Sequence, residues 1–265
     1  MKAKIPEGLD LILKNNTAGS TELLRMLNSF FLKNQELEPE FPHYIALASS
    51  GKLRTFAAVQ NYLKDFELVL RNNNAAETRS FLLGFENSLV SFYQRLYENA
   101  KPAIGSFRTV ITISNSYTLT QVFRLWKQDN PELKVIVPES RTKREGRIFA
   151  RNLLGYGLSV EFITEAMIAE FTLKADAAII GADMLLSNGN AVNKSGSRLL
   201  ALSAGYYKKP FIVITGKDKL SPAVEYTPED YPPEELWEFR DGRLKVTNHY
   251  FEEVEKELIT MVITG

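Results

Sequence analysis

The 265-residue sequence contains no cysteine and only two histidines, His43 and His249. The absence of cysteine excludes disulfide bonds, thiolate zinc sites and cysteine nucleophiles. The scarcity of histidine excludes most histidine-rich metal sites and leaves few candidates for acid–base catalysis. We therefore expect neither a bound metal nor another cofactor.

Long apolar runs and an excess of charge are also missing. No run approaches the roughly 18 apolar residues that a membrane-spanning helix needs. Residues 1–16 lack the apolar stretch and small-residue cleavage site of a signal peptide, so we expect a cytoplasmic protein with no membrane contact. Lysine plus arginine equals aspartate plus glutamate, 32 against 32, so no overall field attracts nucleic acid.

The apolar pattern changes near Pro102. Before it, apolar residues recur at helical steps, and we interpret an aromatic stripe over Phe81–Leu96 as part of a helical core. After it, short apolar runs alternate with helix-length amphipathic segments, which is typical of βαβ units and a parallel sheet. The runs are Phe107–Ile113, Leu133–Val137, Val160–Ile163, Ala177–Ile180 and Phe211–Ile214. We predict an α/β fold: a smaller all-helical N-terminal domain (1–102), a hinge at 101–106, and a Rossmann-like parallel-sheet domain (103–265).

The most informative segment is Gly181–Ser197, with the sequence GADMLLSNGNAVNKSGS. It places Asp183 at the end of a buried strand, followed by Asn193, Lys194 and a serine–glycine cluster that opens a helix. Ligands of open α/β sheets bind outside the carboxyl ends of the strands. A carboxylate, an amide, an ammonium group and a helix N-terminus in one loop predict a site for a polyhydroxylated, anionic small molecule.

Two further residues follow predicted strands at the same sheet edge. Arg141 is suited to a phosphate through its bidentate guanidinium group, although a surface charge explains it equally well. We interpret Lys143 and Arg147 as solvent-exposed residues of the next helix. Ser114 caps a helix in the simplest interpretation, since no histidine and no G-x-S-x-G motif accompany it. We expect Ser114, Arg141 and Asp183 to meet in one pocket.

Two segments of the N-terminal half precede expected helices. Ser49, Ser50 and Gly51 come before an amphipathic helix over Leu53–Leu70, and Thr17–Ser20 comes before another helix. Plain capping of a helix N-terminus explains each segment. Binding of an anion at the helix N-terminus is the alternative.

Three motifs together resemble the translation initiation factor two-B alpha/beta/delta superfamily, which includes methylthioribose-1-phosphate isomerase and ribose-1,5-bisphosphate isomerase. They lie in Glu139–Gly146, Gly181–Gly189 and Val192–Gly196, and Ala48–Gly51 matches the regulatory alpha subunit. The resemblance covers most of the chain and implies a helical domain on a Rossmann-like domain, in a homodimer or larger homo-oligomer. It implies ligand-binding roles for Ser49, Ser50, Gly51, Arg141, Asn193 and Lys194, and catalytic positions for Asp183 and Ser114.

The chain departs from the isomerases of this superfamily at four positions, one of which is Glu165 in place of the usual aspartate. Those enzymes convert an aldose 1-phosphate into a ketose phosphate with a cysteine and the aspartate that Asp183 matches. Here Ser114 replaces the cysteine, and its hydroxyl titrates far above a thiol and has no adjacent base in the sequence. Ile113 replaces a histidine, and Glu145 replaces a glutamine, which places a carboxylate where it would repel a phosphate. These replacements argue against isomerase chemistry.

Three functional hypotheses follow. The first is a binding protein of the initiation factor two-B type that holds a phosphorylated sugar or nucleotide as a regulatory ligand. The second is an aldose-phosphate isomerase in which Asp183, alone or with Ser114, moves protons. The third is an assembly or translation-factor subunit without a ligand, whose partner is initiation factor two.

Overall fold

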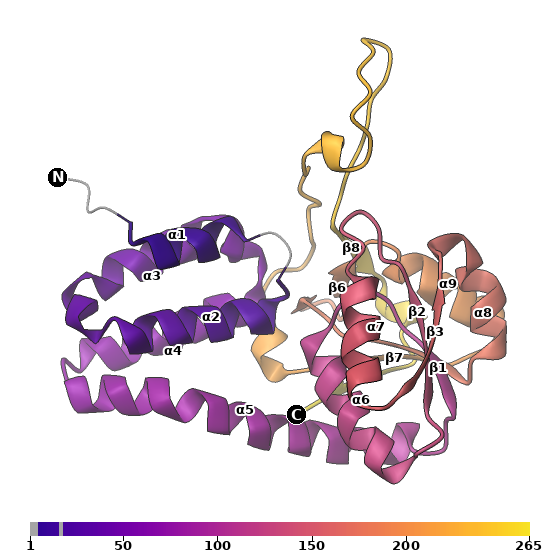
Figure 1. The fold of residues 1–265 in the computed structure, drawn as a ribbon, viewed down its shortest axis with the longest axis horizontal. Helices are drawn as coiled ribbons and strands as arrows, with labels where there is room; N and C mark the ends of the chain where they lie inside the picture. The colour runs from indigo at the N-terminus through magenta and orange to yellow at the C-terminus, as the bar shows by residue number, and fades with distance from the viewer. Residues whose placement is uncertain (1–4, 16–17) are drawn as a thin grey trace.

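A helical unit and an α/β unit share one long helix in the computed structural model, which describes residues 5–15 and 18–265 (Figure 1). The α-helices of the helical unit are α1 (Glu7–Lys14), α2 (Ser20–Lys33), α3 (Phe41–Ser50), α4 (Ala57–Arg71) and α5 (Ala75–Ile104). Two short 3-10 helices connect them: η1 (Gln35–Glu40) and η2 (Lys52–Thr55).

Aromatic side chains fill the core of the helical unit. Phe31 packs edge-on against Phe41, and Phe66 stacks on Phe81 with ring centroids 5.3 Å apart. Such large apolar surfaces dominate the free energy gained by burial. Phe81 and Phe85 pack against this cluster, so the first part of the aromatic stripe belongs to a helical core, as predicted.

Helix α5 runs through both units. Its first half packs in the helical core through Phe81, whereas Leu96 and Ala100 in its second half are buried in the core of the α/β unit. Pro102 lies inside α5, so the expected hinge at 101–106 falls on the last turn of a continuous helix and the residues after it. The boundary between 102 and 103 stays a prediction, since the core of the α/β unit already begins near Tyr93.

The α/β unit contains a parallel six-stranded sheet with the order β3-β2-β1-β4-β7-β9. These strands are β1 (Thr109–Ile111), β2 (Lys134–Pro138), β3 (Ser159–Ile163), β4 (Ala177–Ile180), β7 (Phe211–Thr215) and β9 (Met261–Thr264). A small antiparallel sheet, β5-β6-β8, is made of β5 (Met184–Leu185), β6 (Ala191–Lys194) and β8 (Phe251–Val254). All five predicted strands are therefore confirmed.

Helices cover both faces of the main sheet. Alternate strand residues point to opposite faces, and neighbouring residues such as Val110 and Ile111 are both buried. On β1, Val110 lies in the core shared with α5, α6 (Tyr117–Asp129) and α7 (Gly146–Gly155). The next residue, Ile111, lies in the core shared with α8 (Ile168–Lys174) and α9 (Ser197–Tyr206). This three-layer arrangement confirms the predicted α/β class with its helical N-terminal region.

The strand order changes direction between β1 and β4, which are neighbours in the sheet although three crossovers, through α6, α7 and α8, separate them along the chain. Open α/β sheets bind ligands at such a switch point, outside the carboxyl ends of the strands. The remaining 3-10 helices are η3 (Glu165–Met167), η4 (Lys217–Lys219), η5 (Pro233–Glu235) and η6 (Lys256–Leu258). The segment between η4 and β8 projects from the α/β unit as a long arm (Figure 1).

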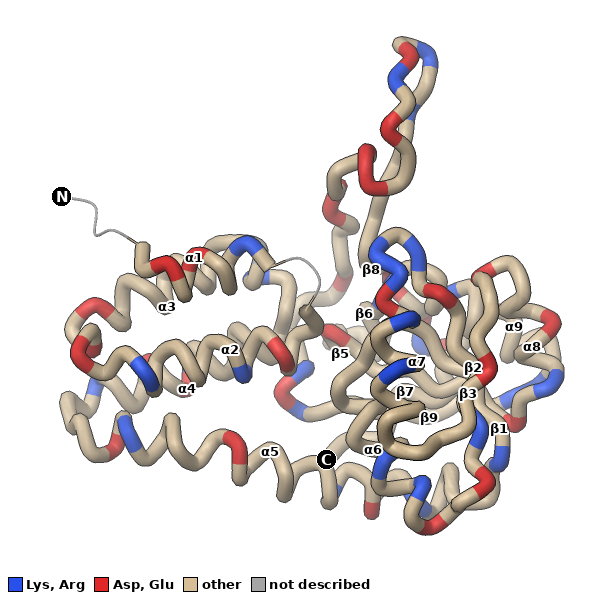
Figure 2. Tube along the Cα trace, in the orientation of Figure 1, with Lys and Arg blue, Asp and Glu red and all other residues tan. Residues whose placement is uncertain are grey.

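Charged residues of both signs are interspersed along both units (Figure 2). In the part of the chain that the structure describes, no helix is long and apolar enough to cross a membrane.

Candidate functional site

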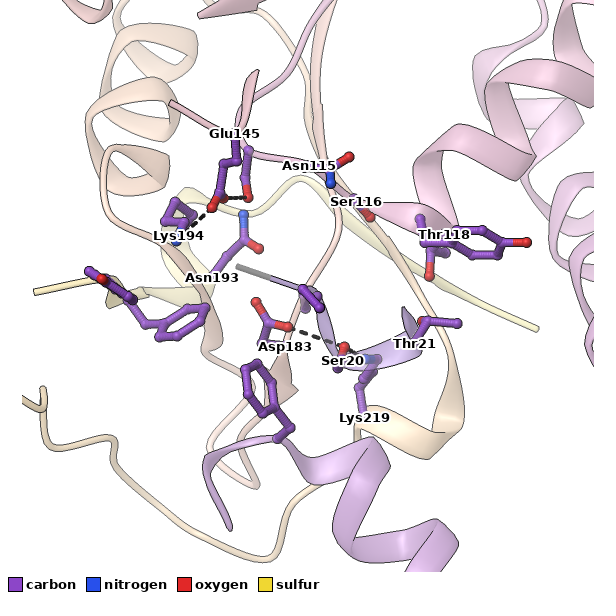
Figure 3. Close-up of a pocket in the computed structure, with 18 of the residues that line it drawn as sticks. Ser20, Thr21, Asn115, Ser116, Thr118, Glu145, Asp183, Asn193, Lys194 and Lys219 are labelled. Atoms are coloured by element: carbon purple, nitrogen blue, oxygen red, sulfur yellow. Dashed lines mark hydrogen bonds and ion pairs between the residues drawn. The ribbon is translucent and has the colours of Figure 1, made fainter. Parts of the chain in front are cut away.

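A cavity lies where the start of α2 meets the switch point of the sheet (Figure 3). Its walls are residues 18–21 and 114–118, the loop before α7, the β5–β6 hairpin, and segments next to β7 and β8. The cavity volume is about 80 Å³, and the wider space between the walls, about 860 Å³, includes open solvent. The N-terminal ends of α2 and α6 both border this cavity, and helix N-termini favour anions.

Asp183 lies three residues after the end of β4, among the side chains that line the cavity (Figure 3). Its Oδ1 accepts a hydrogen bond of 3.3 Å from the Ser20 hydroxyl, to which the buried Lys219 ammonium group donates in turn. Burial of the carboxyl raises the pKa of Asp183 above its usual value, against the opposing positive charges of Lys219 and Lys194. The residue keeps some surface open to the cavity. A carboxyl held toward its neutral form in a cavity can donate as well as accept hydrogen bonds.

A second polar group joins the loop before α7 to β6. Lys194 and Glu145 form an ion pair of 3.0 Å, with 7% and 9% of their side chains exposed. Ser114 donates its hydroxyl hydrogen to the other oxygen of Glu145, Oε1. The ammonium group of Lys194 also faces the rings of Tyr250 and Phe251, at 4.7 and 5.1 Å from their centroids. Such contacts with aromatic faces hold a cation in place.

This arrangement corrects two expectations about Ser114 and Glu145. The Ser114 hydroxyl does have an adjacent base, because the fold brings Glu145 to it from a distant loop. The Glu145 carboxylate was expected to repel a phosphate, and it is instead neutralised by Lys194. Both residues line the cavity.

The local backbone explains how these groups are presented. Ser114 has a positive φ of 74°, which is costly for a residue with a side chain, and its amide donates to Ser140 Oγ at 2.9 Å. Gly146 follows Glu145 at a tight reversal of the chain. A Cβ atom on Gly146 would lie 1.9 Å from the carbonyl oxygen of Pro138. Only glycine therefore lets this loop turn back and deliver Glu145 to the cavity.

The segment Gly181–Ser197 forms the predicted strand end and helix start, with a β-hairpin between them. Asn193 lines the cavity, and its side-chain amide donates to Ser197 Oγ at 2.8 Å. The N-terminus of α9 was expected to be available to an anion. It is instead occupied by Glu252, whose Oε1 accepts hydrogen bonds from the backbone of Gly196 and Arg198.

Several predicted residues lie elsewhere. Ser49 and Ser50 end α3 and Gly51 follows it, because the expected helix over Leu53–Leu70 begins only at Ala57. A helix C-terminus disfavours anions, and none of these three residues lines the cavity.

Arg141 also lies outside the cavity, on the surface, where its backbone amide donates to Glu165 Oε1 at 2.9 Å. Ser114 and Asp183 thus meet in one pocket as expected, without Arg141. Lys143, expected in solvent, pairs with Glu235 of η5 in the arm, whereas Arg147 is exposed as expected.

Sequence reasoning missed Lys219, Tyr231 and Tyr250, which line the cavity. Lys219 follows the apolar run of β7, so the strand-end rule that identified Asp183 could have found it. The rings of Tyr231 and Tyr250 stack 3.6 Å apart, from segments with no signal in the sequence. Ser20 was interpreted as part of a helix start, which α2 confirms, whereas Thr17 lies outside the described residues. Among the described residues, no cluster of acidic and histidine side chains could hold a metal ion.

The fold and the cavity define a class of protein: a doubly wound α/β protein with a helical N-terminal region and a polar ligand cavity at its switch point. Within this class, the chain belongs to the Initiation factor 2 subunit family, whose model matches residues 56–265.

Comparison with known proteins gives the following likenesses. The chain is 27% identical to the ribose 1,5-bisphosphate isomerase of Methanocaldococcus jannaschii over 68% of this chain and 60% of that protein. It is 23% identical to the ribose 1,5-bisphosphate isomerase of Archaeoglobus fulgidus over 98% of this chain and 88% of that protein. A solved structure of Pyrococcus horikoshii translation initiation factor eIF-2B matches with a TM-score of 0.83 and 24% identity, over 98% of this chain and 95% of the other.

The substitution Asp183→Asn tests the raised pKa of this carboxyl. Because the pKa is higher in the folded than in the unfolded state, the protonated form is favoured by folding. That stabilisation is complete below the unfolded pKa, about 4, and is lost as the pH rises through the folded pKa. The wild type should therefore lose stability relative to Asp183→Asn by up to about 1.4 kcal/mol per pH unit in this window. Urea unfolding from pH 4 to 8 measures the difference, and a constant difference contradicts the assignment.

Proposed function

We propose that the chain binds a small phosphorylated sugar or nucleotide in the switch-point cavity, as a regulatory ligand. The observation that carries this proposal is the convergence of Asp183, Ser20, Asn193 and two lysines on one cavity bordered by two helix N-termini. Hydroxyl groups of a sugar pair with carboxylates and amides, and a phosphate suits a helix N-terminus. The family membership and the sugar bisphosphate named for two relatives support the same class of ligand.

A regulatory role is proposed because the sequence has no cysteine to act as the catalytic thiol that the superfamily resemblance implies. We also propose assembly into a homodimer or larger homo-oligomer and an association with initiation factor two. These two points rest on the family membership. The remaining hypothesis is a subunit that binds no ligand. It predicts that no ligand occupies the cavity at any concentration tested.

Isothermal titration calorimetry with ribose 5-phosphate and AMP tests the binding proposal. We expect saturable binding to the wild type, and a loss of roughly tenfold to hundredfold in affinity for Asp183→Asn, since an amide nitrogen replaces a buried oxygen that can accept a hydrogen bond from a sugar hydroxyl. Glu67→Gln, which removes an exposed carboxylate on α4, is the matched control and should bind like the wild type. Absence of binding by the wild type, or equal binding by Asp183→Asn, contradicts the proposal.

A second candidate function is aldose-phosphate isomerisation, and the hydrogen bond from Ser114 to Glu145 favours it. Opening of the sugar ring needs a general acid, a task that suits a carboxyl with a raised pKa such as Asp183. Transfer of hydrogen between C1 and C2 then needs a base beside the open chain. Ser114 with its carboxylate partner Glu145 lines the same cavity as Asp183 and provides that base.

Phosphorus NMR with aldose 1-phosphates tests this second candidate. If the wild type forms a ketose phosphate, Ser114→Ala should lower the turnover number about a hundredfold or more, the usual contribution of general acid–base catalysis. Ser106→Ala, at an exposed serine outside the cavity, should leave turnover unchanged. Absence of product with the wild type eliminates the isomerase and leaves the binding proposal standing.

A further inference from the structure

The charged side chains that line the cavity nearly balance one another. Among the described residues these are two lysines, Lys194 and Lys219, and two carboxylates, Glu145 and Asp183, and no arginine accompanies them. Lys194 is bound directly to Glu145, and Lys219 is connected through the Ser20 hydroxyl to Asp183. The walls therefore carry two positive charges and at most two negative ones, and the raised pKa of Asp183 leaves them between neutral and singly positive.

This balance limits how much negative charge a ligand can bring. Each phosphate group carries up to two negative charges and needs donors or cations of its own. A phosphate that drew the Lys194 ammonium group away from Glu145 would break their ion pair. That would leave a buried carboxylate without its counter-ion, which is among the costlier arrangements in a protein interior.

Most other anion-binding groups near the cavity are already in use: Ser116 caps the N-terminus of α6, whereas α2 begins without a side-chain cap. The backbone amides at the start of α9 are occupied by Glu252. Arg141, which follows β2 in the loop before α7, lies on the surface outside the cavity. The described walls thus offer polar groups for one phosphate and for sugar hydroxyls, and they lack a second cationic subsite.

We propose that the cavity selects ligands with a single phosphate group, a sugar monophosphate or a nucleoside monophosphate, over sugar bisphosphates, and that Glu145 determines this preference. The inference rests on the proposed function, because it concerns the ligand of the same cavity. It distinguishes this chain from the two relatives whose names specify a bisphosphate. Both candidate ligands are phosphate esters of ribose. Separate titrations with ribose 5-phosphate and AMP distinguish the sugar phosphate from the nucleotide.

Calorimetric titration of the 265-residue protein with ribose 5-phosphate, AMP and ribose 1,5-bisphosphate, at one pH and ionic strength, tests the preference. We expect a dissociation constant at least about tenfold lower for one of the monophosphates than for the bisphosphate. Glu145→Gln keeps the shape of the side chain, removes its charge and releases Lys194. In this variant the affinity for the bisphosphate should rise about tenfold relative to that for the monophosphate.

Glu139→Gln is the matched control on the same loop, since Glu139 pairs with Arg147 outside the cavity. It should leave the ratio of affinities unchanged. The comparison of ligands on the wild type needs no variant, and a melting curve shows whether Glu145→Gln is folded.

Each outcome is decisive. Equal or tighter binding of the bisphosphate by the wild type overturns the inference while the proposed function stands. A ratio that is the same in folded Glu145→Gln as in the wild type removes Glu145 from the explanation. If no phosphate ester binds to the wild type or to either variant, the proposed function itself fails and the inference fails with it.

Discussion

The ion pair between Lys194 and Glu145 is the interaction on which the cavity depends. Both side chains are nearly inaccessible to solvent, so each charge is costly without the other. The pair joins β6 to the loop before α7 and places a carboxylate oxygen against the Ser114 hydroxyl. One contact therefore fixes the positions of three cavity residues and also sets the net charge that a ligand meets.

The fold supports this contact from several directions. The parallel sheet brings the ends of β1 and β4 together, so that Ser114 and Asp183 lie at one edge. Helix α5 packs in both cores and thereby joins the helical unit to this edge. The start of α2 then supplies Ser20, whose hydroxyl connects Asp183 to Lys219. The cavity is thus a product of both units, and neither alone contains all of its polar groups.

Part of the site could be predicted because it follows from local patterns. The apolar run of β4 ends at Asp183, and parallel strands share an edge, so the sequence predicts Asp183 and Ser114 in one pocket. The pairing of Lys194 with Glu145 depends on a strand and a loop far apart in the chain, and no sequence periodicity predicts such a contact. Arg141 was misplaced for the same reason, since the sequence shows that it follows a strand and does not show where its loop turns.

The error at Ser49, Ser50 and Gly51 has a different cause. A serine–glycine cluster between two helical patterns can end the first helix or begin the second, and the apolar period is the same on both sides. In the structure η2 separates the two helices, and the cluster lies at the end of α3. A single sequence predicts the existence of a helix better than the residue at which it ends. Both helices were therefore predicted, and the boundary between them was not.

A crystal structure of the protein with bound ribose 5-phosphate tests the central claim most directly, namely that a nearly charge-balanced cavity receives one phosphate ester. The account predicts the sugar beside Asp183 and Asn193, with Lys194 and Glu145 still within hydrogen-bonding distance of each other. A ligand bound elsewhere on the protein would contradict it. So would a phosphate held by Lys194 with the Glu145 side chain displaced from the ion pair.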